Sequence, residues 1–251
     1  MNCWGQITID EKHGSAFVPL GSPTYDYYGA DRIGKGLFGN CILALDARTG
    51  KRLWHFQAVH HDLWDYDFCS APQLITVEHG GKRIEAVAIA GKQGFLYVFE
   101  RLTGKPLWPI EERPVPQSTM PGEKSWPTQP YPTVVPPFTR HTLGIDDLNP
   151  YFSEEKKKQW RKRFPAAKVG LYEPLSDQYE TIAVPGAVGG ANRGNTAADP
   201  ERGLVYIITQ EYASVYRLKQ EHPLPSETVP EAAAGVAPPV TVAEGQTPYH
   251  A

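Results

Sequence analysis

The sequence has 251 residues, 41% of them hydrophobic and 21% charged, which is typical of a chain that folds around a hydrophobic core. Its net charge of −3 provides no positive field that would attract nucleic acid, so nucleic acid is not an expected partner. The 24 prolines and 23 glycines argue against a helical bundle, while 13 tyrosines and 6 tryptophans suit half-buried strands. We therefore predict an all-β architecture.

Neither the cysteines nor the hydropathy pattern points to a special class of protein. The three cysteines, Cys3, Cys41 and Cys69, are too few and too scattered for a disulfide framework or a zinc ribbon. No apolar run approaches the ~20 residues that a membrane span requires. The N-terminal MNCWGQITIDEKHG lacks the charged leader and apolar segment of a signal peptide, so we expect no export signal or transmembrane segment in the chain as written.

Short apolar or alternating runs, each closed by turn residues, recur along the chain and predict strands. They are QITID (6–10), SAFVPL (15–20), CILALD (41–46), AVAIA (86–90), GFLYVFE (94–100) and LVYIIT (204–209).

Two matched pairs of hairpins indicate a repeat. ALDARTGKRLW (44–54) and VFERLTGKPLW (98–108) share a strand, an acid, a Thr-Gly turn and a Trp at a fixed offset. ITIDEKHGSAFVPL (7–20) and TAADPERGLVYIIT (196–209) share an Asp, three residues, a Gly and an alternating strand. Each hairpin alone is an ordinary β-turn, but two matched pairs predict the blades of a propeller, about four of them.

The segment HHDLWDYD (60–67) is crowded with groups that bind protons or metals. Its acids are candidates for a general base, for metal ligands or for turn caps. A zinc site is disfavoured, because adjacent histidines on a strand point to opposite faces. If the segment is extended, Asp65 and Asp67 share a face; Asp62 and Asp67 are expected to cap turns, and a single carboxylate walled by Trp64 is suited to act as a base.

A Pro-rich excursion over 111–150, densest at 113–141, lies between the two halves of the chain. Because so many prolines exclude long helices and central strands, we expect an extended segment that follows the surface. A short helix is predicted at about 153–164, with Ser153 as its N-cap and a basic, solvated face. After Lys219 the Pro- and Ala-rich composition predicts a flexible tail over 221–251.

Three longer stretches, which contain repeated hairpins and the segment 60–67, resemble a known family. ALDARTGKRLWHFQAVHHDLWDYD, AGKQGFLYVFERLTGKPLWP and GGANRGNTAADPERGLVYI resemble, in order and spacing, the quinoprotein dehydrogenases that use pyrroloquinoline quinone (PQQ), above all the membrane-bound glucose and polyol dehydrogenase branch. The resemblance covers roughly residues 1–220 and implies part of an eight-bladed β-propeller. Trp54 and Trp108 match the family's tryptophan-docking motif, in which the Trp of one blade packs against its neighbour.

The resemblance also implies roles for four residues. Asp65, the second Asp of the HxDxWD motif, matches the base that takes the proton of the substrate. Lys92, 27 residues later, matches a lysine that contacts the quinone, and Asn192 in GGAN matches an asparagine that touches the cofactor. Trp4 aligns with the tryptophan on which the quinone stacks. Without the resemblance, the sequence favours a core position for Trp4, while Lys92 has the alternative of a surface lysine beside a turn and Asn192 that of a turn residue.

The sequence departs from the family pattern at two places near the site. Arg193 follows the Asn where the family usually has Trp, and Ser22 stands where some relatives have a calcium-binding Asn. The calcium ligands are therefore open, with Asp26 as a weak candidate. The segment AEGQTPYHA resembles the lead-in to a c-type haem segment, without any CxxCH.

We interpret the chain as a fragment of a quinoprotein dehydrogenase that oxidises a sugar, polyol or alcohol by hydride transfer to PQQ. The resemblance implies a periplasmic location, ubiquinone or a cytochrome as electron acceptor, a calcium ion, and missing blades that another chain could supply. The alternative is a non-catalytic propeller scaffold or an inactive truncated fragment. A scaffold has no need to keep the Asp, the Lys and the Gly-flanked Asn together, which favours the enzyme as ancestry.

Overall fold

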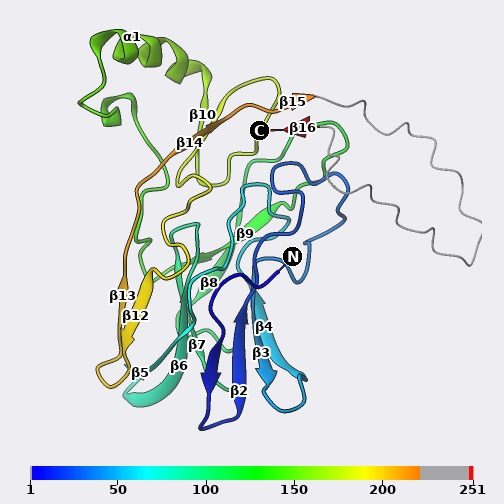
Figure 1. Ribbon diagram of the computed structural model, residues 1–251, viewed down its shortest axis with the longest axis vertical. Coiled ribbons are helices and arrows are strands. Elements are labelled where there is room, and N and C mark those ends of the chain that lie inside the picture. Colours follow the sequence, from blue (N-terminus) through cyan, green and yellow to red (C-terminus); the bar gives the residue numbers. More distant parts are fainter. Residues whose placement is uncertain (1, 221–248, 251) are drawn as a thin grey trace, which may run out of the picture.

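The computed structural model describes residues 2–220 and 249–250 and consists mainly of short antiparallel sheets (Figure 1). The strands are β1 (Thr8–Asp10), β2 (Ser15–Pro19), β3 (Cys41–Asp46), β4 (Arg52–Gln57), β5 (Gln73–His79), β6 (Lys82–Ala90), β7 (Leu96–Glu100), β8 (Ile110–Pro114), β9 (Thr128–Pro132), β10 (Lys168–Gly170), β11 (Thr181–Ala183), β12 (Thr196–Asp199), β13 (Leu204–Ile207), β14 (Ser214–Tyr216), β15 (Lys219–Gln220) and β16 (Tyr249–His250). The helices are η1 (Ile145–Asp147), α1 (Glu154–Arg163) and η2 (Phe164–Ala166).

The first sheet is an antiparallel meander in the order β1-β2-β3-β4. In β2 every second residue is buried, as expected for a strand that packs one face on a core. The next sheet, β5-β6-β7, lies beside it, and the β12-β13 hairpin follows along the edge of β5 (Figure 1). This succession of radially placed meanders confirms the expected partial propeller; within the described residues no sheet closes into a ring.

The two repeated Thr-Gly motifs form matching hairpin turns. In the first, Asp46 Oδ1 accepts hydrogen bonds from the N–H and the hydroxyl of Thr49, each 2.8 Å long, and Gly50 has φ +70°. In the second, Gly104 has φ +71°, in the left-handed region that favours glycine. The second pair of repeats likewise forms the hairpins β1-β2 and β12-β13.

Trp54 docks the first sheet onto the second. Its indole N–H donates a 3.0 Å hydrogen bond to the carbonyl of Arg101, and the ring lies flat against Gly104, where a Cβ would come within 2.5 Å of Cδ2. Trp108, at the same position of the second repeat, is only half-buried and packs against the smaller of two core clusters. The docking contact expected for both tryptophans is therefore observed at Trp54, whereas the described residues bury Trp108 only in part.

The Pro-rich excursion is more structured than the expected surface segment. It contains the antiparallel pair β8-β9, and Met120 and Gln129 within it are buried. The prolines do prevent any long strand, but polar side chains anchor the segment to the loops above the sheets. The excursion therefore packs against the loop that contains His60 and His61.

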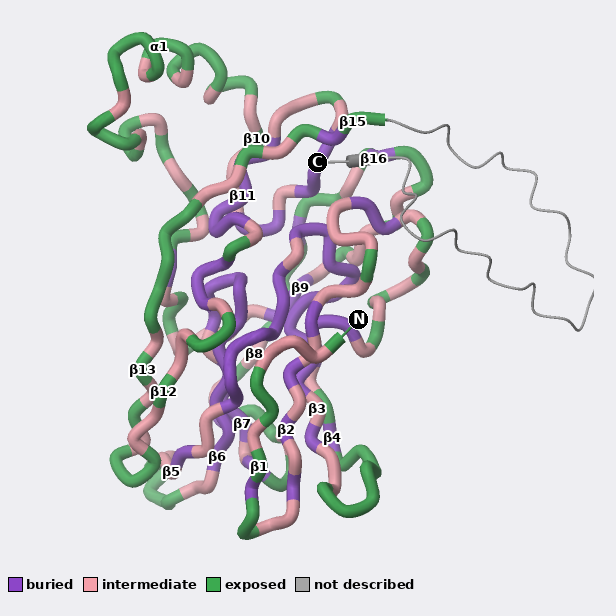
Figure 2. The backbone as a smooth tube through the Cα atoms, viewed as in Figure 1, coloured by how far each residue is buried: buried purple, intermediate pink, exposed green. Residues whose placement is uncertain are grey.

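The helix α1 begins at Glu154, and Ser153 is its N-cap, since its Oγ accepts a hydrogen bond from the N–H of Lys156. None of its residues is buried (Figure 2). The predicted tail over 221–251 falls outside the described residues except for β16, which pairs with β15. The described residues include no helix that is both long and apolar enough to cross a membrane.

Burial is greatest where the loops at the upper ends of the strands meet (Figure 2). The segment 58–71 is almost continuously buried, although it contains no strand. Its aromatic residues join the main core cluster together with Tyr97 and Phe99 of β7. The sheets thus support a packed set of loops, and the candidate site lies among those loops.

Candidate active site

The segment 60–67 is an irregular loop between β4 and β5 rather than an extended strand. Asp62 closes it from within: Oδ1 accepts the N–H of Trp64 at 2.9 Å, and Oδ2 accepts the N–H of Tyr66 and the amide of Asn40, each at 2.8 Å. Asp65 has φ +61°, a left-handed conformation that Asp tolerates better than most residues. The expected turn-capping role of Asp62 agrees with these contacts.

The two histidines anchor the loop to the Pro-rich excursion at separate points. His60 Nε2 lies 2.9 Å from a carboxylate oxygen of Glu112, and His61 Nε2 lies 2.8 Å from one of Glu123. The His61–Glu123 pair is almost completely buried, and the second ring nitrogen of His61 contacts the carbonyl of Gly34 at 2.8 Å. Burial lowers the pKa of His60. Each imidazole is thus used within the framework of the loop.

Three of the four residues singled out in the sequence meet at one point. The ammonium of Lys92 lies 2.8 Å from Asp65 Oδ2 and 5.5 Å from the centre of the Trp4 ring. It also lies 2.6 Å from Oδ2 of Asp67, which the sequence led us to expect as a turn cap. Asp67 is therefore the site residue that sequence reasoning missed, although its spacing of two residues from Asp65 was a usable signal.

Burial controls the electrostatics of this cluster. Burial and, next, the charge of Asp67 raise the pKa of Asp65 to about 8, outweighing the attraction of Lys92. Burial opposes the charge of Lys92, yet the two carboxylates raise its pKa well above the usual value. One ammonium thus faces two carboxylates, and Asp65 is the more exposed of the two.

Asn192 lies beside this cluster and is bound within its own loop. Its amide donates to the carbonyl of Val188 at 2.7 Å, and its Oδ1 accepts the N–H of Arg193 at 2.7 Å. The thiol of Cys69 lies 3.9 Å from the same Oδ1. The side chain of Arg193 is exposed. Asn192 thus lies next to Cys69 and stabilises the loop that carries it.

Two glycines let that loop press against Lys92. Gly189 has φ +80°, and a Cβ there would come within 2.5 Å of the Lys92 stem. The N–H of Gly190 donates a 2.7 Å hydrogen bond to the carbonyl of Lys92. A larger residue at position 189 would displace the lysine.

Asp26, the weak candidate for calcium, is half-buried near the same cluster. Burial raises its pKa, and the nearby carboxylates of Asp62 and Asp67 raise it further. Among residues 2–220 and 249–250, no three His, Cys, Asp or Glu side chains converge in the manner of a metal site. Ser22 donates hydrogen bonds from its backbone N–H to Asp67 and from its hydroxyl to Asp62.

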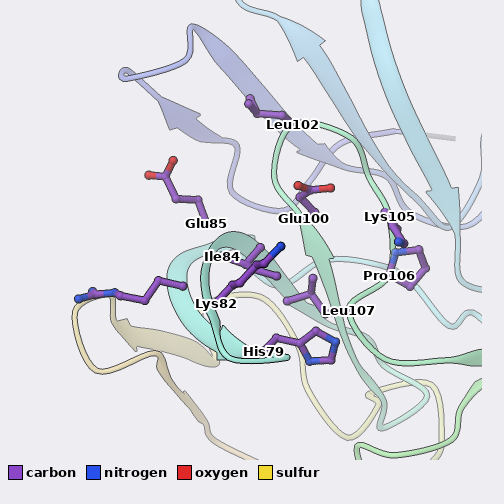
Figure 3. A pocket seen from close by; sticks show the side chains of 10 residues that line it. His79, Lys82, Ile84, Glu85, Glu100, Leu102, Lys105, Pro106 and Leu107 are labelled. Atoms are coloured by element: carbon purple, nitrogen blue, oxygen red, sulfur yellow. The ribbon is translucent and has the colours of Figure 1, made fainter.

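A pocket of about 530 Å³ lies elsewhere in the described part of the chain (Figure 3). It is lined by His79, Lys82, Arg83, Ile84, Glu85, Glu100, Leu102, Lys105, Pro106 and Leu107. These residues lie at the hairpin ends of β5-β6 and β7, roughly 30 Å along β6 from Lys92 at 3.3 Å per residue. The pocket is therefore separate from the Asp65–Lys92 cluster.

Comparison with known proteins shows similarity to one family over the whole chain. The family described as PQQ glucose/ethanol/alcohol dehydrogenase, β-propeller domain, matches residues 1–251. The probable quinate dehydrogenase (quinone) of Xanthomonas campestris pv. juglandis is 33% identical over 98% of this chain and 31% of its own length. The glycerol dehydrogenase large subunit of Gluconobacter thailandicus is 33% identical over 87% of this chain and 30% of its own length.

Solved structures agree on the fold. The quinohemoprotein alcohol dehydrogenase of Comamonas testosteroni matches 87% of this chain with a TM-score of 0.55 and 22% sequence identity. The match covers 26% of that protein. The chain thus spans about three tenths of the length of the relatives that it matches.

Proposed function

Because this chain belongs to the family of PQQ-dependent glucose, ethanol and alcohol dehydrogenases, we propose that it carries the catalytic base and part of the cofactor pocket of a quinoprotein dehydrogenase. The substrate would be a sugar, a polyol or another small alcohol. The observation that carries the proposal is the meeting of Asp65, Lys92 and Trp4, which are far apart in the sequence, around one ammonium.

Asp65 takes the role of the base. Oxidation of an alcohol carbon by hydride loss requires the hydroxyl proton to leave, and a positioned carboxylate can accept it. The side chain of Asp65 is 24% exposed, whereas that of Asp67 is 6% exposed, so a substrate hydroxyl can approach Asp65. Its raised pKa makes it a stronger base than an ordinary Asp. Oδ2 contacts Lys92, which leaves Oδ1 to receive the proton.

The residues present fit a flat, anionic quinone. The half-buried Trp4 ring offers a face for stacking, and the Lys92 ammonium faces the same space. PQQ, when bound, supplies the hydride acceptor. Lys92 would stabilise negative charge developing on a quinone oxygen, and Asn192 would offer its amide at the border of the pocket.

We include calcium as a second cofactor, acting as a Lewis acid. Asp26 is the candidate ligand in this chain. Calcium takes roughly six to eight oxygen ligands, so the others would come from the cofactor and from segments of the longer relatives that this chain does not span.

The whole protein would work in the periplasm and pass electrons to ubiquinone or a cytochrome. Its remaining blades would come from a longer chain or from a separate one. This is supported by apolar side chains on the outer sheets, which a neighbouring blade would cover. They are Ile7 before β1, Ile9 in β1, and Leu204 and Tyr206 in β13, all at least 45% exposed.

The competing function is a non-catalytic propeller scaffold or an inactive fragment. A scaffold requires Trp54 and the hairpins but has no use for a buried lysine between two carboxylates, because the desolvation of even paired buried charges costs free energy. The Lys92 cluster therefore favours the dehydrogenase.

Titration of the purified chain with PQQ and calcium, followed by tryptophan fluorescence, tests the proposal. We expect saturable quenching that Lys92→Met weakens by about tenfold or more, as loss of a charged contact would. Trp108→Phe is the matched control and should bind as the parent does. Asp65→Asn should also bind. Absence of any quenching in the parent chain would leave only the scaffold or the inactive fragment.

A further inference from the structure

We propose that Asp67 is the positioning residue of this site: it is the permanent counterion of Lys92 and holds the ammonium beside Trp4 while Asp65 gains and loses the substrate proton. This inference rests on the proposed function for its catalytic meaning, but its structural content can be tested without turnover.

Asp67 is fixed at both ends of its carboxylate. Oδ2 forms the 2.6 Å ion pair with Lys92, and Oδ1 accepts the backbone N–H of Ser22 at 2.6 Å. In addition, the carbonyl of Asp67 accepts the backbone N–H of Lys92 at 3.2 Å. Side chain and main chain of Asp67 thus both hold Lys92, which is a geometry suited to positioning.

Asp65 differs in each of these respects. Its carboxylate is about four times as exposed as that of Asp67, at 24% against 6%. Within residues 2–220, it has no hydrogen-bond partner other than Lys92. Asp65 is therefore free to exchange a proton with a ligand, whereas Asp67 is committed to the framework.

The charges explain why two carboxylates are required. When Asp65 becomes neutral by accepting a proton, the Lys92–Asp67 pair remains and is itself neutral. Without Asp67, the same proton transfer would leave a 95% buried ammonium with no counterion. Asp67 thus allows Lys92 to stay charged and in place through the proton transfer.

Asp67 also connects Lys92 to the segment that carries Trp4. A Cβ on Gly21 would collide with Asp67 Oδ1 and would come within 3.0 Å of the Trp4 Nε1 atom, so this glycine permits the close approach. The N–H of Gly21 donates to the carbonyl of Asn2 at 2.9 Å. The N-terminal segment, the loop at 21–22 and Lys92 therefore converge on a single carboxylate.

Competitive acetylation of lysines in the folded chain, quantified at Lys92 by mass spectrometry at fixed pH, tests the proposal. In Asp67→Asn we expect the labelling rate of Lys92 to rise by about tenfold or more, as a lowering of its pKa by one unit would produce. Asp62→Asn is the matched control, because Asp62 is equally buried in the same loop but does not contact Lys92. It should leave labelling of Lys92 close to that of the parent chain.

Asp65→Asn provides a second arm, which does not depend on whether Asp67→Asn folds. We expect Lys92 to stay protected in that variant, since Asp67 remains its counterion. Unprotected Lys92 in Asp65→Asn, unchanged labelling in a folded Asp67→Asn, or equal increases in Asp67→Asn and Asp62→Asn would each overturn the proposal. Failure of PQQ to quench the parent chain would instead reject the proposed function and leave this result standing.

Discussion

Removal of the Trp54 side chain tests the docking of one blade on the next. The side chain is 8% exposed, lies between Phe17 and Phe99 at 5.8 and 5.7 Å between ring centres, and donates one buried hydrogen bond. Truncation of a buried Trp costs about 3–5 kcal/mol, and the carbonyl of Arg101 loses its donor. For a chain of this size we expect Trp54→Ala to lower the melting temperature by roughly 10 °C, at 2–4 °C per kcal/mol.

Urea unfolding followed by far-ultraviolet circular dichroism measures this effect without relying on tryptophan emission. Trp108→Ala is the matched control, because Trp108 occupies the same position of the repeat but is only half-buried. Its cost should be about half as large. If both variants lose the same free energy of unfolding, the contact of Trp54 with Gly104 does not dock the sheets.

Three further predictions concern the site. Because burial raises the pKa of Asp65 from 3.8 to about 8 in the folded chain, folding binds its proton more tightly, so its contribution to stability falls as pH rises from about 4 to about 8 and is constant above. Urea midpoints of Asp65→Asn should lack this slope, and in the whole enzyme dye-linked turnover should rise with pH through about 8. Glu123→Gln replaces the buried carboxylate that contacts His61 and should cost about 1–3 kcal/mol, as expected when a buried hydrogen-bond partner is lost. Urea unfolding measures this cost, and the exposed Glu154→Gln should cost under about 0.5 kcal/mol. Gly189→Ala places a methyl group against the Lys92 stem and should weaken the quenching by PQQ. Gly194→Ala is the control, since its φ is also positive but no atom lies within 4 Å of the added methyl group, and it should weaken the quenching less. Equal weakening would show that the backbone strain at positive φ, and not the contact with Lys92, causes the effect.

The repeats were readable from the sequence because each is local. A Thr-Gly turn after an acid sets a hairpin and returns a Trp at a fixed offset, so the hairpins were predicted from the spacing alone. That Trp54 docks one blade on the next was implied by the family resemblance. The N-cap at Ser153 is equally local. The excursion was harder to predict, since Glu112 and Glu123 gain their meaning only from histidines more than 50 residues away.

The second partner of Lys92 was missed because Asp67 was predicted to cap a turn. Alternation placed Asp65 and Asp67 on one face and so indicated a shared contact, although the loop is not extended and both His61 and Asp65 adopt left-handed conformations. The two aspartates contact the same ammonium and differ in burial. The segment itself could not show that Lys92 would lie against both carboxylates.

The three aspartates of the loop HHDLWDYD differ in how many hydrogen bonds and ion pairs hold each carboxylate in place. Asp62 accepts hydrogen bonds from within the loop, and Asp67 is bound to Lys92 and Ser22; both are buried and satisfied. Asp65 is the most exposed of the three, adopts a left-handed conformation and has the weakest attachment. A residue that must change its charge cannot also be a fixed part of the framework, because loss of the charge would weaken every hydrogen bond that its carboxylate accepts. The neighbouring acids therefore do more than support the loop: they accept backbone N–H groups and leave Asp65 as the carboxylate in the segment that a ligand can reach.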